Sequence, residues 1–222
     1  MDIVAEMASI VSCDRGATMK AMHIDDVLDR AHVVSLPLAV RFRGITTREA
    51  LLIDGPAGWG EFAPFLEYGP AESVAWLRAG LEAAYEGFPE PVRDSIEANA
   101  TIPAVPASEV TAVVERYPGC RTFKIKVAEK GHTLADDAAR VRAVRDAVTQ
   151  RGEIPILRVD ANGGWSVDEA VEAAQMMMPL DYMEQPCATT EELAQVRGRL
   201  MRAGLFVRVA ADESIRKVAD PY

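Results

Sequence analysis

Four charged residues stand where predicted strands in the second half of the chain end. They are Lys126, Asp160, Glu184 and Asp212. The gaps between them are 34, 24 and 28 residues, each the length of one strand followed by one helix. Strands that alternate with such helices run parallel, and their carboxyl ends meet at one edge of the sheet or at one mouth of a barrel. The spacing therefore predicts that these four side chains gather there.

Three carboxylates in one place point to a bound cation. Converging carboxylates repel one another and raise one another's pKa values, and a divalent cation removes this cost. Ligands that are all oxygen favour a hard ion, so we expect Mg²⁺, with Mn²⁺ as the second choice. The predicted metal ligands are Asp160, Glu184 and Asp212.

A lysine pair accompanies the carboxylates. Lys124 and Lys126 occupy alternate positions of one predicted strand and therefore point to the same side. The charges of Lys124 and of the cation disfavour the protonated form of Lys126, so we expect its pKa to fall toward neutral pH. Such a lysine suits a general base that removes a proton from the carbon next to a carboxylate. The plain alternative is four unrelated surface charges.

Alternating strands and helices are expected to position these residues. The strands are predicted over 122–127, 154–160, 180–184 and 206–212, after a helix over 106–117. Thr133 can cap the helix that follows the first of these strands, and Gly152 can close it. Two later helices begin at capping boxes, where a Ser or Thr and a Glu satisfy each other's backbone groups. The boxes are Ser166 with Glu169 and Thr189 with Glu192.

The first part of the chain has a different pattern. Apolar runs at 33–38 and 50–53 predict strands, the second closed by a turn at 54–56. Glycines and aromatic residues between 58 and 70 predict a loop. Apolar residues at spacings of three and four then predict a helix, on one face of which lie Val74, Leu77, Leu81 and Ala84.

Composition excludes several classes of protein. The 222 residues carry a net charge of -10 without any Lys/Arg-rich block, which argues against nucleic-acid binding. No apolar stretch reaches the roughly 20 residues of a membrane span, and acidic residues near the start argue against a secretory signal. Three widely spaced cysteines, Cys13, Cys120 and Cys187, favour a reducing cytoplasm over disulfides or a zinc site. The sequence leaves the oligomeric state open.

Four short motifs carry a resemblance to a known family. They are Lys124-Ile125-Lys126, Asp160-Ala161-Asn162, Glu184-Gln185-Pro186 and Asp212-Glu213-Ser214. In this order and spacing they resemble the enolase superfamily, in its muconate-lactonizing-enzyme-like subgroup. Residues 41–46, 58–62, 182–187 and 210–217 add to the likeness. The superfamily's use of a lysine base with Mg²⁺ is known, and here it agrees with the chemistry of the residues.

The resemblance implies an α/β protein, with an α+β capping domain followed by a partial (β/α) barrel of about five of eight strands. The expected regions are a flexible tail over 1–22, the capping domain over 23–98 and the incomplete barrel over 99–222. The first domain would cap the barrel mouth, and its aromatic-rich loop would exclude water. The chain stops after the fifth predicted barrel strand, before the lysine that the family carries on the sixth. We therefore expect a truncated chain with little activity by itself.

The resemblance also implies a reaction. Members most like this chain dehydrate a succinyl-hydroxy-cyclohexadiene carboxylate to 2-succinylbenzoate in menaquinone biosynthesis. Lys126 would move the proton, Lys124 would tune it, and Asn162 would support the metal shell, while the substrate-binding residues stay unknown. The rivals are an N-succinylamino-acid racemase or dipeptide epimerase, and less so a muconate cycloisomerase. A non-enzymatic, structural remnant is the remaining alternative.

Overall fold

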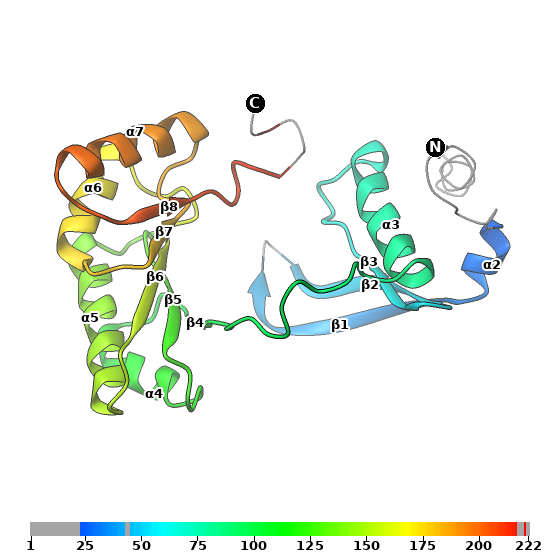
Figure 1. Ribbon diagram of the computed structural model, residues 1–222, viewed down its shortest axis with the longest axis horizontal. Helices are drawn as coiled ribbons and strands as arrows, with labels where there is room; N and C mark the ends of the chain where they lie inside the picture. Colours follow the sequence, from blue (N-terminus) through cyan, green and yellow to red (C-terminus); the bar gives the residue numbers. More distant parts are fainter. Residues whose placement is uncertain (1–22, 43–44, 217–219, 221–222) are drawn as a thin grey trace. The chain divides into compact units, whose positions relative to one another are not determined.

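The computed structural model describes residues 23–42, 45–216 and 220. The chain divides into two compact units, Met1–Asp94 and Ser95–Tyr222, which are described separately (Figure 1). The tail predicted over 1–22 lies outside the described residues, as do Arg43, Gly44 and Lys217 of the family motifs. No helix in the described ranges is long and apolar enough to span a bilayer.

The first unit is an antiparallel sheet with a helix packed on it. Its strands are β1 (Ala31–Phe42), β2 (Ile45–Gly55) and β3 (Gly58–Phe62), in that order across the sheet. Helix α2 (Ile24–Leu28) precedes them and α3 (Pro70–Tyr85) follows. The predicted helical face is the packing face, since Leu77, Leu81 and Ala84 are buried against Ile53 and Val27.

The segment 58–62, predicted as part of a loop, is strand β3 instead. Gly58 pairs with Gly55 and closes the tight turn between β2 and β3, whereas Gly60 lets α3 approach the sheet. A Cβ at Gly60 would lie 1.9 Å from the backbone oxygen of Gly80, and a Cβ at Gly80 would lie 2.6 Å from that of Glu61. Glycine here serves close packing of a helix on a strand, which local turn patterns do not distinguish from a bend.

The second unit is a five-stranded parallel sheet covered by helices. The strands β4 (Ala100–Ile102), β5 (Thr122–Lys126), β6 (Ile156–Asp160), β7 (Tyr182–Glu184) and β8 (Arg208–Ala210) lie in sequence order. The helical elements between them are η1 (Ala107–Glu109), α4 (Val110–Val114), α5 (Leu134–Gln150), α6 (Val167–Met177) and α7 (Thr190–Arg202). Figure 1 shows α5 and α6 along one side of the sheet. The sheet and its order match the predicted part of a (β/α) barrel.

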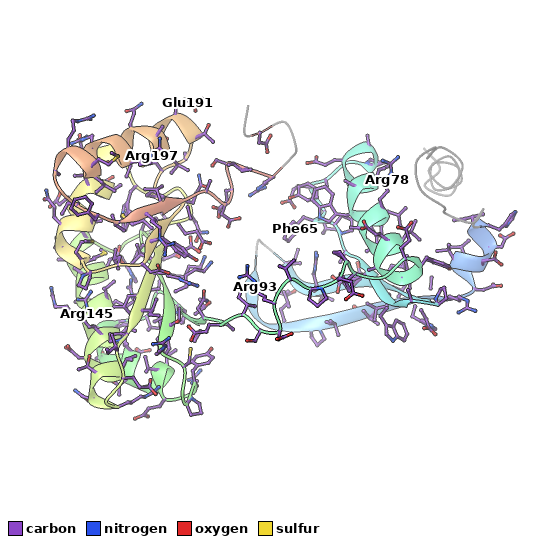
Figure 2. The ribbon with its side chains drawn as sticks, in the orientation of Figure 1. Phe65, Arg78, Arg93, Arg145, Glu191 and Arg197 are labelled. Carbon is purple, nitrogen blue, oxygen red and sulfur yellow. The ribbon has the colours of Figure 1, made fainter. Side chains whose placement is uncertain are left out.

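Local sequence signals fixed the helix starts of this unit. Thr133, Ser166 and Thr189 each accept a hydrogen bond from the backbone three residues on, and all three positions form full capping boxes. The helix predicted over 106–117 is shorter, since only η1 and α4 are helical there. Arg145 of α5 (Figure 2) donates to the carbonyl oxygens of Met177 (2.7 Å) and Pro179 (3.2 Å), where its charge meets the negative end of α6.

The strands are shorter than predicted at several ends. The sheet side under the helices agrees with the prediction, since Phe123, Ile125 and Val127 are buried. The strand predicted over 206–212 is confined to Arg208–Ala210, because its partner β7 ends at Glu184, which pairs with Ala210. A parallel ladder needs a neighbour at each step, so Asp212 falls beyond the last strand.

The contact between Gly60 and Gly80 gives a direct test of the first unit. Gly60→Ala should destabilise this unit by about 2 kcal/mol, because the methyl group cannot fit against the backbone of α3. Hydrogen exchange should show faster exchange over residues 23–94 and unchanged exchange in the second unit. Gly69→Ala is the control, since nothing lies within 4 Å of its Cβ. Equal exchange in the two variants would contradict the packing described.

Candidate active site

The parallel register places the predicted charged residues side by side. Lys126 pairs with Asp160 across β5 and β6, and Asp160 pairs with Glu184 across β6 and β7. Residues that pair across a sheet point to the same face, so these three share the face opposite the helices. Lys124 lies two positions before Lys126 and shares that face.

The side chains on this face make a compact cluster of alternating charge. Lys126 Nζ lies 2.6 Å from Asp160 Oδ2. Lys124 Nζ lies 2.6 Å from Glu184 Oε1 and 3.1 Å from Asp160 Oδ2. The side chain of Asp160 is 1% exposed and that of Glu184 12%, while the lysines reach solvent at 22% and 33%. The structure therefore brings together four of the predicted site residues.

The charges of this cluster decide its protonation. Burial alone would raise the pKa of Asp160, but hydrogen bonds and charge from Lys126 and Lys124 outweigh burial and hold the pKa below its ordinary value. Burial would likewise lower the pKa of Lys124, but its bonds to Glu184 and Asp160 raise it. Repulsion among carboxylates does not raise the pKa of Asp160, because the two ammonium groups supply compensating positive charge.

Asn162 links the cluster to a residue that sequence analysis did not single out. Its Oδ1 accepts a 2.8 Å hydrogen bond from Lys126 Nζ, and its backbone N–H donates to Asp160 Oδ1. Its Nδ2 donates to Glu213 Oε1 at 2.6 Å. The other oxygen of Glu213 is buried and has no hydrogen-bond partner among the described residues. The sequence feature that could have identified Glu213 was its position next to Asp212 in the motif Asp212-Glu213-Ser214.

Asp212 does not join the cluster. It is exposed, it lies in a bend after β8, and its backbone N–H donates to Gln185 Oε1 at 2.7 Å. In the described ranges, no three His, Cys, Asp or Glu side chains lie close enough to hold a metal ion. The prediction that all four charges point together into one mouth is therefore met by three, because the β8 ladder ends before Asp212.

A buried ion pair supports the end of β5, and sequence analysis missed it. Arg140 and Asp137 of α5 are each 1% exposed and pair at 2.6 Å. Arg140 also donates to the carbonyl oxygen of Lys126 at 3.0 Å, and Asp137 accepts from the backbone of Ala128 at 2.8 Å. The available signal was two charged residues, spaced by three, on the apolar face of a predicted helix. The pair fixes the backbone on both sides of Val127.

A second polar layer lies below the cluster on the same face. Arg158 stacks over the ring of Tyr182 at 4.9 Å, and the Tyr182 hydroxyl donates to Glu184 Oε2 at 3.3 Å. Arg158 Nε also donates to Asp181 at 2.9 Å, and Arg208 binds the other oxygen of Asp181. Burial alone would raise the pKa of Asp181, but its bonds to the two arginines lower it overall.

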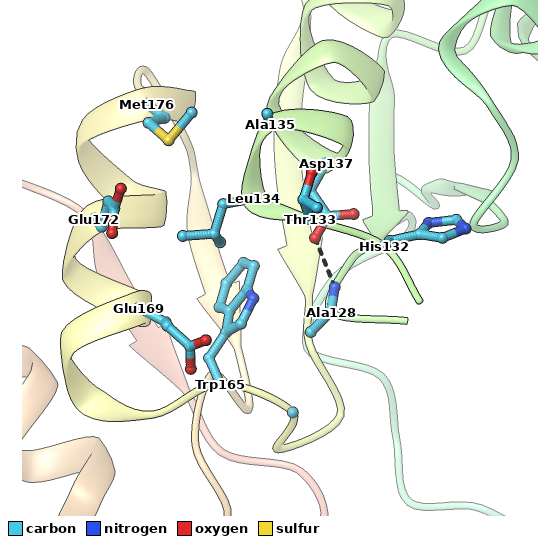
Figure 3. A pocket seen from close by; sticks show the side chains of 11 residues that line it. Ala128, His132, Thr133, Leu134, Ala135, Asp137, Trp165, Glu169, Glu172 and Met176 are labelled. Carbon is cyan, nitrogen blue, oxygen red and sulfur yellow. Dashed lines mark hydrogen bonds between the residues drawn. The ribbon is translucent and has the colours of Figure 1, made fainter. Parts of the chain in front are cut away.

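A cavity of about 470 Å³ lies apart from this cluster, between the start of α5 and α6 (Figure 3). Two of the three acidic residues that line it already accept hydrogen bonds, and the third, Glu172, is exposed. The Asp137 carboxylate accepts from Ala128, and Glu169 is held in its capping box with Ser166. None of the predicted catalytic or metal-binding residues lines it. The cavity is therefore not the candidate site.

Two domain models match the chain. The model described as enolase N-terminal domain-like covers residues 33–84, and the model described as enolase C-terminal domain-like covers residues 106–221. The second match spans more than half of the 222 residues, so the chain belongs to the family of proteins with an enolase-like C-terminal domain. The α/β fold class and the incomplete barrel agree with this assignment.

Comparison with individual proteins identifies relatives of higher sequence identity. The o-succinylbenzoate synthase of Mycolicibacterium smegmatis is 59% identical over 201 residues, which are 89% of this chain and 59% of that protein. The chain thus spans about three fifths of that relative's length.

Solved structures show the same fold. The L-Ala-D/L-Glu epimerase of Bacillus subtilis, in a substrate-liganded complex, matches with a TM-score of 0.61 at 25% identity over 83% of this chain and 67% of that one. The o-succinylbenzoate synthase of Thermosynechococcus elongatus, with Mg in its active site, matches with a TM-score of 0.58 at 19% identity over 86% and 70%.

The second polar layer predicts a pH-dependent contribution to stability. Because the pKa of Asp181 is lowered by folding, its contribution is complete above the unfolded value of about 3.9 and is lost as the pH falls through the folded pKa. Asp181→Asn should therefore cost about 1 kcal/mol at pH 7, and the difference from wild type should vanish toward pH 2.

Urea unfolding at several pH values checks this expectation. Asp168→Asn is the matched control, because the side chain of Asp168 is 84% exposed and its pair with Arg199 lies on the surface. The control should stay within about 0.5 kcal/mol of wild type throughout. A cost of Asp181→Asn that did not change with pH would contradict the ionic interpretation.

Proposed function

We propose that this chain carries the metal-binding and proton-transfer residues of a hydro-lyase, an o-succinylbenzoate synthase of menaquinone biosynthesis. The observation behind the proposal is the cluster of Lys124, Lys126, Asp160 and Glu184 on one face of adjoining parallel strands. The 59% identity to a curated synthase supports the choice of reaction. The substrate would be a small carboxylate. The enzyme would act in the cytoplasm, in keeping with the free cysteines Cys120 and Cys187.

The oxygen donors of the site suit Mg²⁺, with Mn²⁺ as the second choice. Asp160, Glu184 and Asp212 would hold the ion. Asp160 and Glu184 already adjoin across β6 and β7, and Asp212 follows the carboxyl end of the next strand. The buried, unpartnered oxygen of Glu213 supports a further positive charge nearby. The magnesium in the T. elongatus synthase supports the choice of ion.

The residues of the chain would divide the reaction among them. Lys126 would take the proton from the ring carbon that bears the carboxylate, and the electron pair of the broken C–H bond would move into that carboxylate. Bound Mg²⁺ would stabilise the negative charge there. Return of the electron pair would expel the neighbouring hydroxyl, which receives the proton back from Lys126 and leaves as water. The ring becomes aromatic.

Two neighbours would hold the base in place. Asn162 would orient Lys126 through their 2.8 Å hydrogen bond. Lys124, bonded to both Asp160 and Glu184, would keep the carboxylates together and place a second positive charge beside Lys126.

An epimerase acting on N-succinylamino acids or dipeptides is the second candidate. The similarity to the B. subtilis L-Ala-D/L-Glu epimerase favours it, at 25% identity and a TM-score of 0.61. The same lysine and carboxylates would serve there, because both reactions begin with loss of a proton next to a carboxylate. Deuterium exchange into N-succinylamino acids, measured beside dehydration of the cyclohexadiene, separates the two candidates.

The test places these residues in a full-length relative. In a hybrid enzyme, this chain's residues replace the 201 matching residues of the M. smegmatis synthase. The hybrid should dehydrate the cyclohexadiene substrate, followed by ultraviolet absorbance. Lys126→Ala in the hybrid should lower kcat at least about 1,000-fold, the scale of general base catalysis, with a smaller effect on KM.

Lys130→Ala is the control, because Lys130 is an exposed lysine in the loop after β5. It should leave kcat within about twofold of the unaltered hybrid. A hybrid that kept its rate after Lys126→Ala would refute the role of the base. A hybrid that exchanged the proton of N-succinylamino acids without dehydrating the cyclohexadiene would favour the epimerase.

A further inference from the structure

Gln185 is fully buried beside the candidate metal ligands, and both ends of its side-chain amide make hydrogen bonds. It follows Glu184 at the end of β7 and is 0% exposed. Its Nε2 donates to the carbonyl oxygen of Cys187 at 2.9 Å. Its Oε1 accepts from the backbone N–H of Asp212 at 2.7 Å and from the Ser214 hydroxyl at 3.1 Å. A single amide therefore joins the loop after β7 to the loop after β8.

The side-chain amide of Gln185 continues the connection between β7 and β8 beyond the last backbone pair of the two strands. The β7–β8 pairing ends at Glu184 with Ala210, and one more bond follows from Gln185 N–H to the Ala210 carbonyl oxygen at 2.8 Å. After that point the side chain of Gln185 makes the next connection to the chain of β8, at Asp212. The position of Asp212 relative to Glu184 thus depends on Gln185.

The position needs an amide, because one end must donate and the other must accept. A carboxylate could accept from Asp212 but could not donate to Cys187, and it would be buried without a counter-charge. The backbone of Gln185 is also unusual, with φ at +37°, a left-handed conformation that costs a non-glycine residue about 1 kcal/mol. Buried hydrogen bonds on both sides of the side chain hold the residue there.

We propose that Gln185 is a positioning residue that sets the carboxylate of Asp212 relative to Glu184, and so sets the affinity of the site for a divalent cation. The inference rests on the proposed function, because it takes Glu184 and Asp212 as metal ligands. The Gln185 amide makes the connection between the two chains that backbone hydrogen bonds of a longer β8 strand would otherwise make. Groups that orient metal ligands from behind change affinity by about 10- to 100-fold when removed.

The test measures binding of Mn²⁺ alone to the 222-residue chain, from the electron paramagnetic resonance signal of the free ion, with Mg²⁺ as competitor. Gln185→Gly removes the amide and also relieves the left-handed backbone, which favours folding of the variant. Its Kd for Mn²⁺ should rise at least about tenfold while circular dichroism shows a folded chain. Hydrogen exchange at the amides of Asp212 and Ser214 should speed up. A merely structural role would lower the melting temperature and leave the Kd of the folded chain unchanged.

Three further variants make the outcome decisive. Gln195→Ala, at an exposed glutamine of α7, should leave the Kd unchanged. Ser214→Ala removes one bond to Oε1 and should raise the Kd about threefold, and it decides the matter by itself if Gln185→Gly does not fold. Asp160→Asn should abolish binding.

The results separate this inference from the proposed function. If Asp160→Asn abolishes binding but Gln185→Gly and Ser214→Ala bind as wild type does, the role of Gln185 is overturned and the metal site stands. If the unaltered chain binds no Mn²⁺, or binds it equally well after Asp160→Asn, the metal site and the role of Gln185 are both overturned.

Discussion

The need to compensate the buried charge of Asp160 is the constraint on which the arrangement of the candidate site in the second unit depends. A charge that is 1% exposed is stable only when opposite charge and hydrogen bonds replace water. Lys124 and Lys126 supply that charge, and the backbone of Asn162 supplies a further bond. Both lysines can reach Asp160 because β5 and β6 are parallel and in register. The arrangement is costly to build, and such concentrated charge is typical of sites that perform chemistry.

The loops after β5, β6 and β7 contain backbone conformations with positive φ, which residues other than glycine rarely adopt. Ala128, Asn162 and Gln185 follow β5, β6 and β7, and their φ values are +58°, +46° and +37°. Each of the three is tied down by a polar contact. Asp137 binds the backbone of Ala128, Asn162 bonds to Lys126 and Asp160, and the amide of Gln185 bridges two loops. Backbone strain that is compensated in this way keeps the side chains of the candidate site at fixed positions.

Much of the fold could be predicted because its signals are local. The capping boxes at Ser166 and Thr189 and the alternation of buried residues in β5 need only a few neighbouring residues. The loop predicted over 58–70 was wrong in its first part, because Gly60 of β3 packs against Gly80 of a helix that lies twenty residues further along the chain. The ends of strands were also beyond local prediction, since a strand ends where its neighbour stops. For this reason Asp212 lies outside β8.

The sequence by itself determined the family of the chain, the order of its elements and the residues able to do chemistry, because residue type and spacing along strands and helices are properties of the chain alone. Tertiary structure decided which of those residues meet. It joined Lys124, Lys126, Asp160 and Glu184, left Asp212 in a bend, and added Glu213, Arg140 and Gln185. The reason is physical: burial, charge pairing and loop closure depend on residues that are 14 to 60 positions apart, and only the folded chain brings these together.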